Sequence, residues 1–216
     1  MDEKKEEVKK FRFICTRCGN CCTDKNTLVN LTYSDILRIK NGLNLTLEEL
    51  LQVIGFYVFE TELTEEALKK LVIPPIATEK GLSFIGLLKK STGACYFYNE
   101  KEKKCLIYEL RPNFCKSFPF SFKILLNAID KSKAKIIMFL TEKGKVYCPG
   151  IGVDAPLINE DEWIILGKKI IEDLNNNSIL VEKWNDAVKK GEIKQSVRNF
   201  LLNIFKLKEN NNNKKQ

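Results

Sequence analysis

The sequence predicts a mixed α+β fold that is rich in helices and contains a small antiparallel hairpin. Two stretches, one before residue 74 and one after residue 160, combine helix-capping residues with apolar residues at helical spacing. Between them, short runs rich in aromatic and β-branched residues alternate with polar turns, which is typical of strands. A chain of 216 residues, 44% of them hydrophobic, is long enough to bury one sizeable core.

Three helices are predicted in the first stretch. The first spans 32–42, where Asp35 favours the opening turn and an Asn-Gly pair ends the helix. The second spans 46–56 and begins with a capping box formed by Thr46 and Glu49. The third spans 64–71 and ends before a pair of prolines.

The residue pattern in the middle of the chain predicts strands. Residues 82–88 form one strand, and 95–98 and 105–108 form the two arms of a hairpin around the polar turn 99–104. One cysteine falls on each arm. We therefore expect this hairpin to carry part of a multi-cysteine site.

The remaining elements follow from prolines, glycines and periodicity. Residues 111–119 are irregular or a short helix, and 135–141 form a strand after which Gly144 turns the chain. Three helices should then cover 161–174, 178–190 and 192–206, separated by an asparagine run and by Gly191.

We expect one compact unit with three parts beyond a charged, solvated leader at 1–10. Residues 11–152 form a cysteine-cluster metal-binding region, and 153–208 form a helical C-terminal extension packed on it. Residues 209–216, which are mostly asparagine and lysine, should be a disordered tail.

Charge and hydropathy limit the function classes. The net charge of +8 is concentrated in 183–216, where nine Lys or Arg face three Asp or Glu, so a solvated helix face explains it and nucleic-acid binding is not expected. No segment approaches the roughly 20 apolar residues of a membrane span. The charged N-terminus lacks the apolar stretch of a secretory signal, so we expect a cytoplasmic location.

The residues that indicate a functional site are the cysteines. Four thiols fall within eight residues, and four more follow, while the chain contains no histidine. In a reducing compartment such a pattern indicates metal binding rather than disulfides. The candidate metal ligands are Cys15, Cys18, Cys21, Cys22, Cys95, Cys105, Cys115 and Cys148.

The spacing of these cysteines suggests an iron–sulfur cluster of the 4Fe–4S type, or zinc. The first three have the Cys-x-x-Cys-x-x-Cys spacing of a ferredoxin cluster loop, and Cys148 is followed by proline, as is the fourth cysteine of that pattern. In an extended backbone Cys21 and Cys22 would point to opposite sides, toward two centres, or one would bind while the other packs. The spacing favours one cluster bound mainly by the N-terminal loop, with the later cysteines completing it or forming a second site.

The cysteines also allow other interpretations. Single buried cysteines are common in cores, which suits the four later ones better than the dense N-terminal group. A thiol-redox pair at Cys15 and Cys18 lacks the surrounding βαβ pattern, and a radical-enzyme cluster usually has a wider first spacing. Arg111 is a candidate donor to a thiolate, or a surface ion-pair partner. The chain shows no Walker loop, no dinucleotide fingerprint and no serine-nucleophile elbow.

The full cysteine pattern resembles a known family. Besides the N-terminal run, Cys105-Leu-Ile-Tyr, Arg111-Pro-x-x-Cys115-Lys-x-Phe-Pro and Cys148-Pro-Gly resemble the CxxCxxCC cysteine-cluster proteins, to which zinc or iron chelation is attributed. Lys116 departs from this pattern, which usually has arginine there, so a bidentate role at that position is not implied. Flagellin lysine N-methylases carry a similar region, but no methyl-donor site is evident in this sequence.

The resemblance and the thiols together predict a metalloprotein. Its role would be electron transfer, metal handling or structural support, with the metal as its partner and a protein partner unidentified. The alternatives are a protein-modifying enzyme related to the lysine N-methylases, or a zinc-stabilised module that binds nucleic acid through its basic C-terminal helices.

Overall fold

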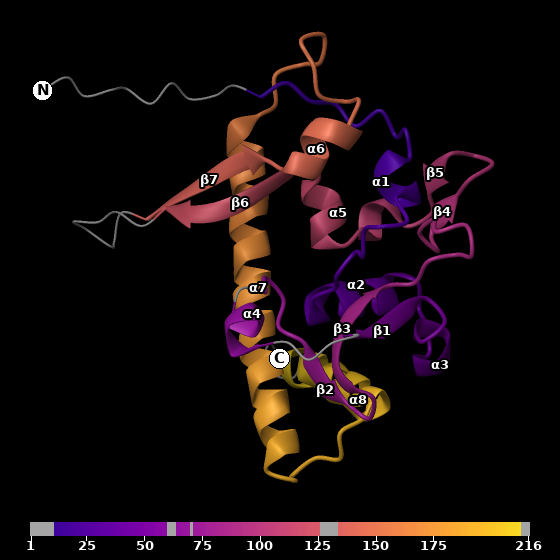
Figure 1. The fold of residues 1–216 in the computed structure, drawn as a ribbon, viewed down its shortest axis with the longest axis vertical. Helices are drawn as coiled ribbons and strands as arrows, with labels where there is room; N and C mark the ends of the chain where they lie inside the picture. Colours follow the sequence, from indigo (N-terminus) through magenta and orange to yellow (C-terminus); the bar gives the residue numbers. More distant parts are fainter. Residues whose placement is uncertain (1–10, 60–63, 70, 126–133, 213–216) are drawn as a thin grey trace, which may run out of the picture.

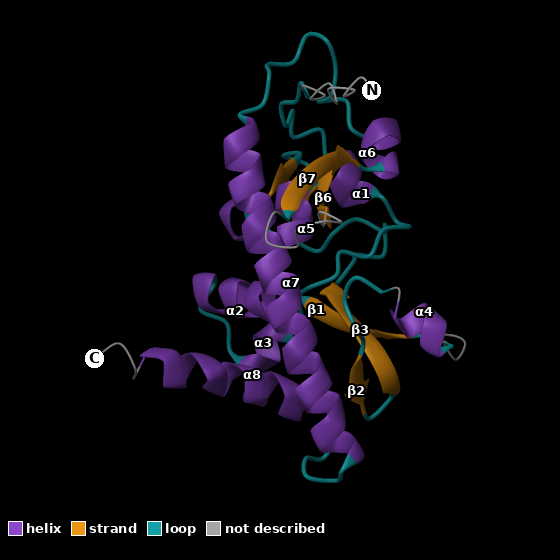
Figure 2. Cartoon of the chain, turned by 90° about the vertical axis from the view of Figure 1, so that its left-hand side faces the viewer, coloured by secondary structure: helices purple, strands orange, loops and turns teal. Residues whose placement is uncertain are grey.

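The computed structural model describes residues 11–59, 64–69, 71–125 and 134–212. One long helix, α7 (Glu160–Lys189), runs along the length of the molecule, and the other elements form two groups beside it (Figure 1). One group contains the first sheet with α2, α3 and α8, and the other contains the cysteine-bearing elements and a two-stranded ribbon (Figure 2). The predicted mixed α+β class is confirmed.

The bounds of the other elements follow the chain order. In the first group they are α2 (Tyr33–Gly42), α3 (Leu47–Leu50), β1 (Ile54–Val58), α4 (Glu65–Lys69), β2 (Ile76–Thr78), β3 (Gly81–Leu87) and α8 (Val197–Asn212). In the second they are α1 (Asn20–Thr23), β4 (Tyr98–Asn99), β5 (Lys104–Cys105), the 3-10 helix η1 (Tyr108–Leu110), α5 (Asn113–Ser117), β6 (Phe120–Leu125), β7 (Lys135–Leu140) and α6 (Glu142–Tyr147).

The main core lies between the first sheet and the helices α2, α7 and α8. The sheet is antiparallel with the order β1-β3-β2. Ile36 and Ile39 of α2 are fully buried in this core. Trp184 of α7 packs edge-on against Phe200 of α8, with ring centroids 5.3 Å apart, and its indole N–H donates to the carbonyl of Ala77 in β2. These contacts attach the C-terminal helices to the sheet.

A second cluster of aromatic side chains joins the N-terminal segment to α7. Phe120, only 2% exposed, lies 5.0 Å from Phe11, 5.6 Å from Phe13 and 4.9 Å from Trp163 between ring centroids. β6 and β7 pair along six residues from Phe120 opposite Leu140, and this ribbon also packs on α7. Burying these large rings holds the chain that enters the cysteine region against the long helix.

Two helix predictions are wrong in their extent. The helix expected over 46–56 ends at Leu50, because the aliphatic and aromatic residues from Ile54 onward pair with β3 instead. The helices expected over 161–174 and 178–190 are the single helix α7. The asparagine run does not break it, because the side chain of Asn177 is buried and accepts a hydrogen bond of 2.9 Å from the amide of Tyr33 at the start of α2.

Other boundaries also differ from the prediction. α8 begins at Val197 and continues to Asn212, so the start of the expected tail is helical and 213–216 lie outside the described residues, as does the leader. Gly144, expected to be a turn, lies inside α6, where its amide donates to the capping hydroxyl of Thr141. The strands β1, β2 and β6 were not predicted.

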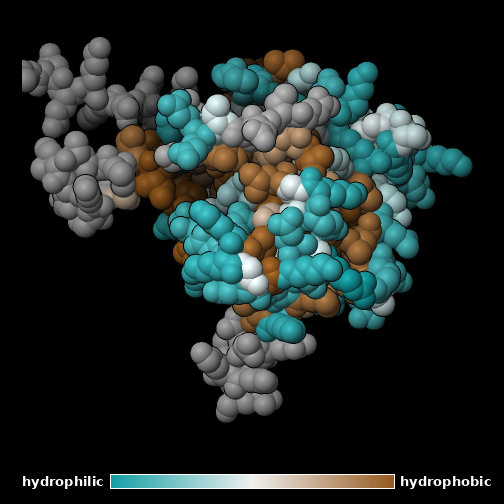
Figure 3. All heavy atoms as spheres, turned by 60° about the horizontal axis from the view of Figure 1, so that its bottom comes forward, coloured by the Kyte–Doolittle hydropathy of each residue, from teal (hydrophilic) through white to brown (hydrophobic). Residues whose placement is uncertain are grey.

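The surface of the described chain is mixed in character. Hydrophilic side chains cover much of the face in Figure 3, with apolar side chains between them. Among the described helices, none combines the length and the apolar character needed to span a membrane.

A buried carboxylate connects α2 to the cysteine-bearing elements. Asp35 is fully buried and accepts hydrogen bonds from the amide and hydroxyl of Thr32, the cap of α2, at 3.1 and 3.0 Å. Its other oxygen pairs with the guanidinium of Arg38 and accepts a hydrogen bond of 3.0 Å from the amide of Asn113 in α5. Arg38 also donates to the carbonyl of Arg111 at 2.8 Å. Asp35 therefore sets the position of α5 relative to α2.

Replacing Asp35 by alanine should destabilise the protein strongly. The variant leaves the guanidinium of Arg38 and the amide of Asn113 without their acceptor, and removing one partner of a buried ion pair usually lowers the free energy of unfolding by about 3–5 kcal/mol. Urea denaturation followed by circular dichroism measures this loss. Glu49→Ala is the matched control, because Glu49 has the same capping role in α3 but is exposed. Equal losses in the two variants would contradict this account.

Candidate metal centre

The cysteine doublet lies in a short helix at the centre of the cysteine region. Gly19 adopts a positive φ of 83° and its carbonyl accepts hydrogen bonds from the amides of Cys22 and Thr23, which starts α1. The expectation of an extended doublet is therefore wrong. The sulfur atoms of Cys21 and Cys22 lie side by side, 3.9 Å apart, rather than on opposite sides.

One side of α1 contacts the segment that carries Cys95 and Cys105. The amide of Cys95 donates to the carbonyl of Cys22 at 2.7 Å. Cys105 lies in β5 directly opposite Tyr98 in β4. The hairpin is confirmed but is shorter than expected, so only Cys105 lies on an arm, whereas Cys95 precedes β4 and pairs with Lys89.

Cys115 lies in α5, which is held from two directions. The amide of Asn113 donates to Asp35, and its side-chain amide donates to Asp173 of α7 at 2.7 Å. The chain between Cys105 and Cys115 is folded compactly by η1. Within it, the guanidinium of Arg111 stacks 3.6 Å from the ring centre of Tyr108 and donates to the carbonyl of Tyr108 at 2.8 Å.

The other side of α1 contacts the segment that carries Cys148. The amide of Ile14 donates to the carbonyl of Gly150 at 3.0 Å. The two backbones are too close for a side chain at position 150, because a Cβ there would lie 2.0 Å from the carbonyl oxygen of Ile14. The side-chain amide of Asn20 donates to the carbonyl of Tyr147 at 3.0 Å. These contacts hold Cys148 beside the N-terminal cysteines, although it is far from them in sequence.

All eight predicted ligands therefore lie on segments that the fold brings around α1, and all are free thiols. Cys15, Cys18 and Cys21 are exposed, and the other five are partly buried. Within the described residues, no three Cys, Asp or Glu side chains already have ligating geometry, so side chains must reorient for a metal to bind. The chemistry of the donor set suits zinc or an iron–sulfur cluster, because thiolates are soft ligands and the chain has no histidine to compete with them.

The thiols influence one another electrostatically. The hydrogen bond from Cys22 lowers the pKa of Cys21 from 9.0 to about 7, and the Arg111 guanidinium also lowers it. That same hydrogen bond, burial and the negative charge of Cys21 raise the pKa of Cys22 above its usual range. Burial is the main cause of the raised pKa of the thiols of Cys95, Cys105, Cys115 and Cys148. A bound cation would favour the thiolates, so metal binding should release protons.

Sequence reasoning missed the groups that hold the loop after α1. Asp24 pairs with Lys143 of α6 at 2.7 Å, and this hydrogen bond holds the pKa of the Asp24 carboxyl well below its usual range. The side chain of Lys89 donates to the carbonyl of Asp24. Tyr98 lies beneath Gly19, where a Cβ would come within 1.9 Å of its hydroxyl. Only Gly19 gave a sequence signal, because a glycine between cysteines indicates a sharply turning loop.

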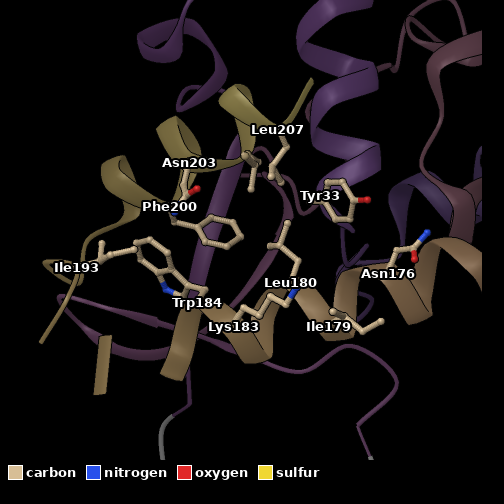
Figure 4. A pocket seen from close by; sticks show the side chains of 11 residues that line it. Tyr33, Asn176, Ile179, Leu180, Lys183, Trp184, Ile193, Phe200, Asn203 and Leu207 are labelled. Atoms are coloured by element: carbon tan, nitrogen blue, oxygen red, sulfur yellow. The ribbon is translucent and has the colours of Figure 1, made fainter. Parts of the chain in front are cut away.

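A separate groove of about 510 Å³ lies between α7 and α8 (Figure 4). Tyr33, Leu180, Trp184 and Phe200 are among the residues that line it, and its lining includes no cysteine, aspartate or glutamate. This groove therefore does not belong to the candidate metal centre.

These features define a small α+β protein with a thiol-only candidate site. Over residues 14–141 the chain matches the family CxxCxxCC, described as "Putative zinc- or iron-chelating domain", and it belongs to that family. An uncharacterized protein of Methanocaldococcus jannaschii is 29% identical over 185 residues, which cover 85% of this chain and 82% of the relative. No solved structure matches the chain. The predicted family is confirmed, and Cys148 lies just beyond the matched residues.

Substituting Gly19 by alanine should destabilise the protein in two ways, through backbone strain at a positive φ and through a clash with Tyr98. A non-glycine residue at positive φ costs roughly 1–2 kcal/mol. Gly81 provides the matched control, because its φ is 104° and a Cβ there would have no neighbour within 4 Å. We expect Gly19→Ala to lower the free energy of unfolding more than Gly81→Ala, because it also displaces Tyr98. Equal losses would show that the contact with Tyr98 is unimportant.

The pKa of Cys21 predicts its reactivity in the reduced, metal-free chain. The thiolate is the reactive form, so alkylation of Cys21 by iodoacetamide should reach half of its maximal rate near pH 7 and slow as the pH falls further. Alkylation of Cys95 and Cys105 should need a higher pH than alkylation of Cys21, because burial raises the pKa of both thiols. Peptide mass spectrometry gives each rate. Cys22→Ala should move the Cys21 profile to higher pH, and an unchanged profile would contradict the proposed hydrogen bond.

Proposed function

We propose that this protein is a cytoplasmic metalloprotein whose cysteine thiolates hold an iron–sulfur cluster, of the 4Fe–4S type, or zinc. The ligands would be the eight cysteines, and the metal centre would serve electron transfer, metal handling or structural support. The region 11–152 would hold the metal, and the helical extension 153–208 would support it.

One observation carries the proposal: segments far apart in sequence bring all the cysteines around α1. Cys95 is tied to Cys22 by a backbone hydrogen bond, and the segments beside Cys15 and Cys148 are tied through Ile14 and Gly150. Cysteines that only pack a core are usually buried, but Cys15, Cys18 and Cys21 are exposed. Exposed, clustered thiols are typical of a reactive or metal-binding site. The family to which the chain belongs supports zinc or iron as the metal.

The surrounding residues suit a negatively charged thiolate centre. Arg111 is held by stacking on Tyr108, and Arg17 lies over the same ring at 4.6 Å, so two cations lie beside the cysteines. The charge of Arg111 adds to the hydrogen bond that lowers the pKa of Cys21, and it opposes the burial that raises the pKa of Cys105 and Cys115. These arginines would offset the charge that several thiolates bring to one place. A reducing compartment would keep the thiols available, which supports the cytoplasmic location.

Purification under anaerobic conditions, followed by metal analysis, tests this proposal. We expect the full chain to contain zinc or iron in stoichiometric amount, because four thiolates bind either tightly. Acid-labile sulfide and visible absorption would identify an iron–sulfur cluster, and their absence from a zinc-loaded chain would identify zinc.

The control is the same chain alkylated in its reduced, unfolded state before metal is offered. Blocked thiols should bind no metal. Unmodified chain that is purified free of metal and cannot be loaded with either metal would contradict the proposal.

A further inference from the structure

The residues next to Cys148 are attached to the early part of the cysteine loop. The carbonyl of Gly150 accepts a hydrogen bond from the amide of Ile14, and the carbonyl of Tyr147 accepts one from the side chain of Asn20, each 3.0 Å long. Farther from Cys148, Lys143 of α6 pairs with Asp24, which follows the loop. Ile14 immediately precedes Cys15, and Asn20 lies between Cys18 and Cys21. These contacts place Cys148 beside the Cys-x-x-Cys-x-x-Cys run.

The later part of the loop is attached to different elements. The carbonyl of Cys22 accepts the 2.7 Å hydrogen bond from Cys95, whose own carbonyl accepts a 2.9 Å bond from the amide of Tyr98. Tyr98 is paired with Cys105, and the compact turn through η1 leads from there to Cys115. Cys22, Cys95, Cys105 and Cys115 are all partly buried, whereas three of the cysteines on the other side are exposed.

We propose that the eight cysteines form two four-thiolate centres rather than one. An outer centre is made by Cys15, Cys18, Cys21 and Cys148. An inner centre is made by Cys22, Cys95, Cys105 and Cys115. This division rests on the proposed function, and it holds for zinc and for a 4Fe–4S cluster, because each takes four thiolates.

The doublet is where the two centres divide. Cys15, Cys18 and Cys148 need a fourth ligand, and Cys21 and Cys22 lie in α1, which contacts the segments of both groups through Asn20 and Cys22. Cys21 has the Cys-x-x-Cys spacing from Cys18 that suits one metal, whereas the backbone of Cys22 is bonded to Cys95. Because the two sulfur atoms are 3.9 Å apart, two centres that divide at the doublet would be immediate neighbours.

Two double variants separate the centres. Cys15→Ser with Cys148→Ser removes outer ligands only, and Cys95→Ser with Cys105→Ser removes inner ligands only. Each full-length chain is reduced, freed of metal, loaded with Cd²⁺ as a thiolate-seeking probe and analysed by native mass spectrometry. The loaded chains are then treated with iodoacetamide, and the modified cysteines are mapped.

We expect the unsubstituted chain to bind about two Cd²⁺ ions and each double variant about one. In the outer variant Cys21 should be alkylated while Cys22 stays protected, and in the inner variant this pattern should reverse. One Cd²⁺ per unsubstituted chain, or loss of protection at Cys21 and Cys22 together in both variants, would overturn the division. The count on the unsubstituted chain decides the matter even if a variant fails to fold.

These outcomes separate the two proposals. An unsubstituted chain that binds one Cd²⁺ with its thiols protected overturns the division and leaves the proposed function standing. A chain that binds no Cd²⁺ and contains no metal as purified overturns both.

Discussion

The hydrogen bond from the amide of Cys95 to the carbonyl of Cys22 joins the two halves of the cysteine set. It is the backbone hydrogen bond between the N-terminal cysteine loop and the segment that leads to the hairpin. The buried carboxylate of Asp35 positions Cys115, because it accepts a hydrogen bond from the amide of Asn113 and so fixes the start of α5 against α2. The site therefore depends on a few polar contacts that cross between distant segments, and the one made by Asp35 is buried.

The sequence was most informative about the chemistry of the site. The absence of histidine and the density of thiols in the first loop pointed to a thiolate centre, and the family was recognisable from the cysteine spacing. The sequence did not show that Cys21 and Cys22 lie in a helix with their sulfur atoms in contact. That geometry depends on the positive φ of Gly19 and on Tyr98 beneath it, which are tertiary features.

The errors in the fold also have tertiary causes. Asn177 belongs to a run that normally ends a helix, yet it lies inside α7 because its side chain caps α2 across the core. Ile54 and the residues after it carry a helical pattern as well as strand-forming residues, and the pairing with β3 decided between them. The local capping signal was reliable at Thr46, where the predicted capping box is present.

X-ray absorption at the edge of the bound metal tests the central claim most directly. Because every proposed ligand is a thiolate, the nearest shell around zinc or iron should contain sulfur only, at about 2.3 Å. Thiolates and cluster sulfides both meet this requirement. A first shell that contains nitrogen or oxygen in place of sulfur would contradict a cysteine-held metal centre.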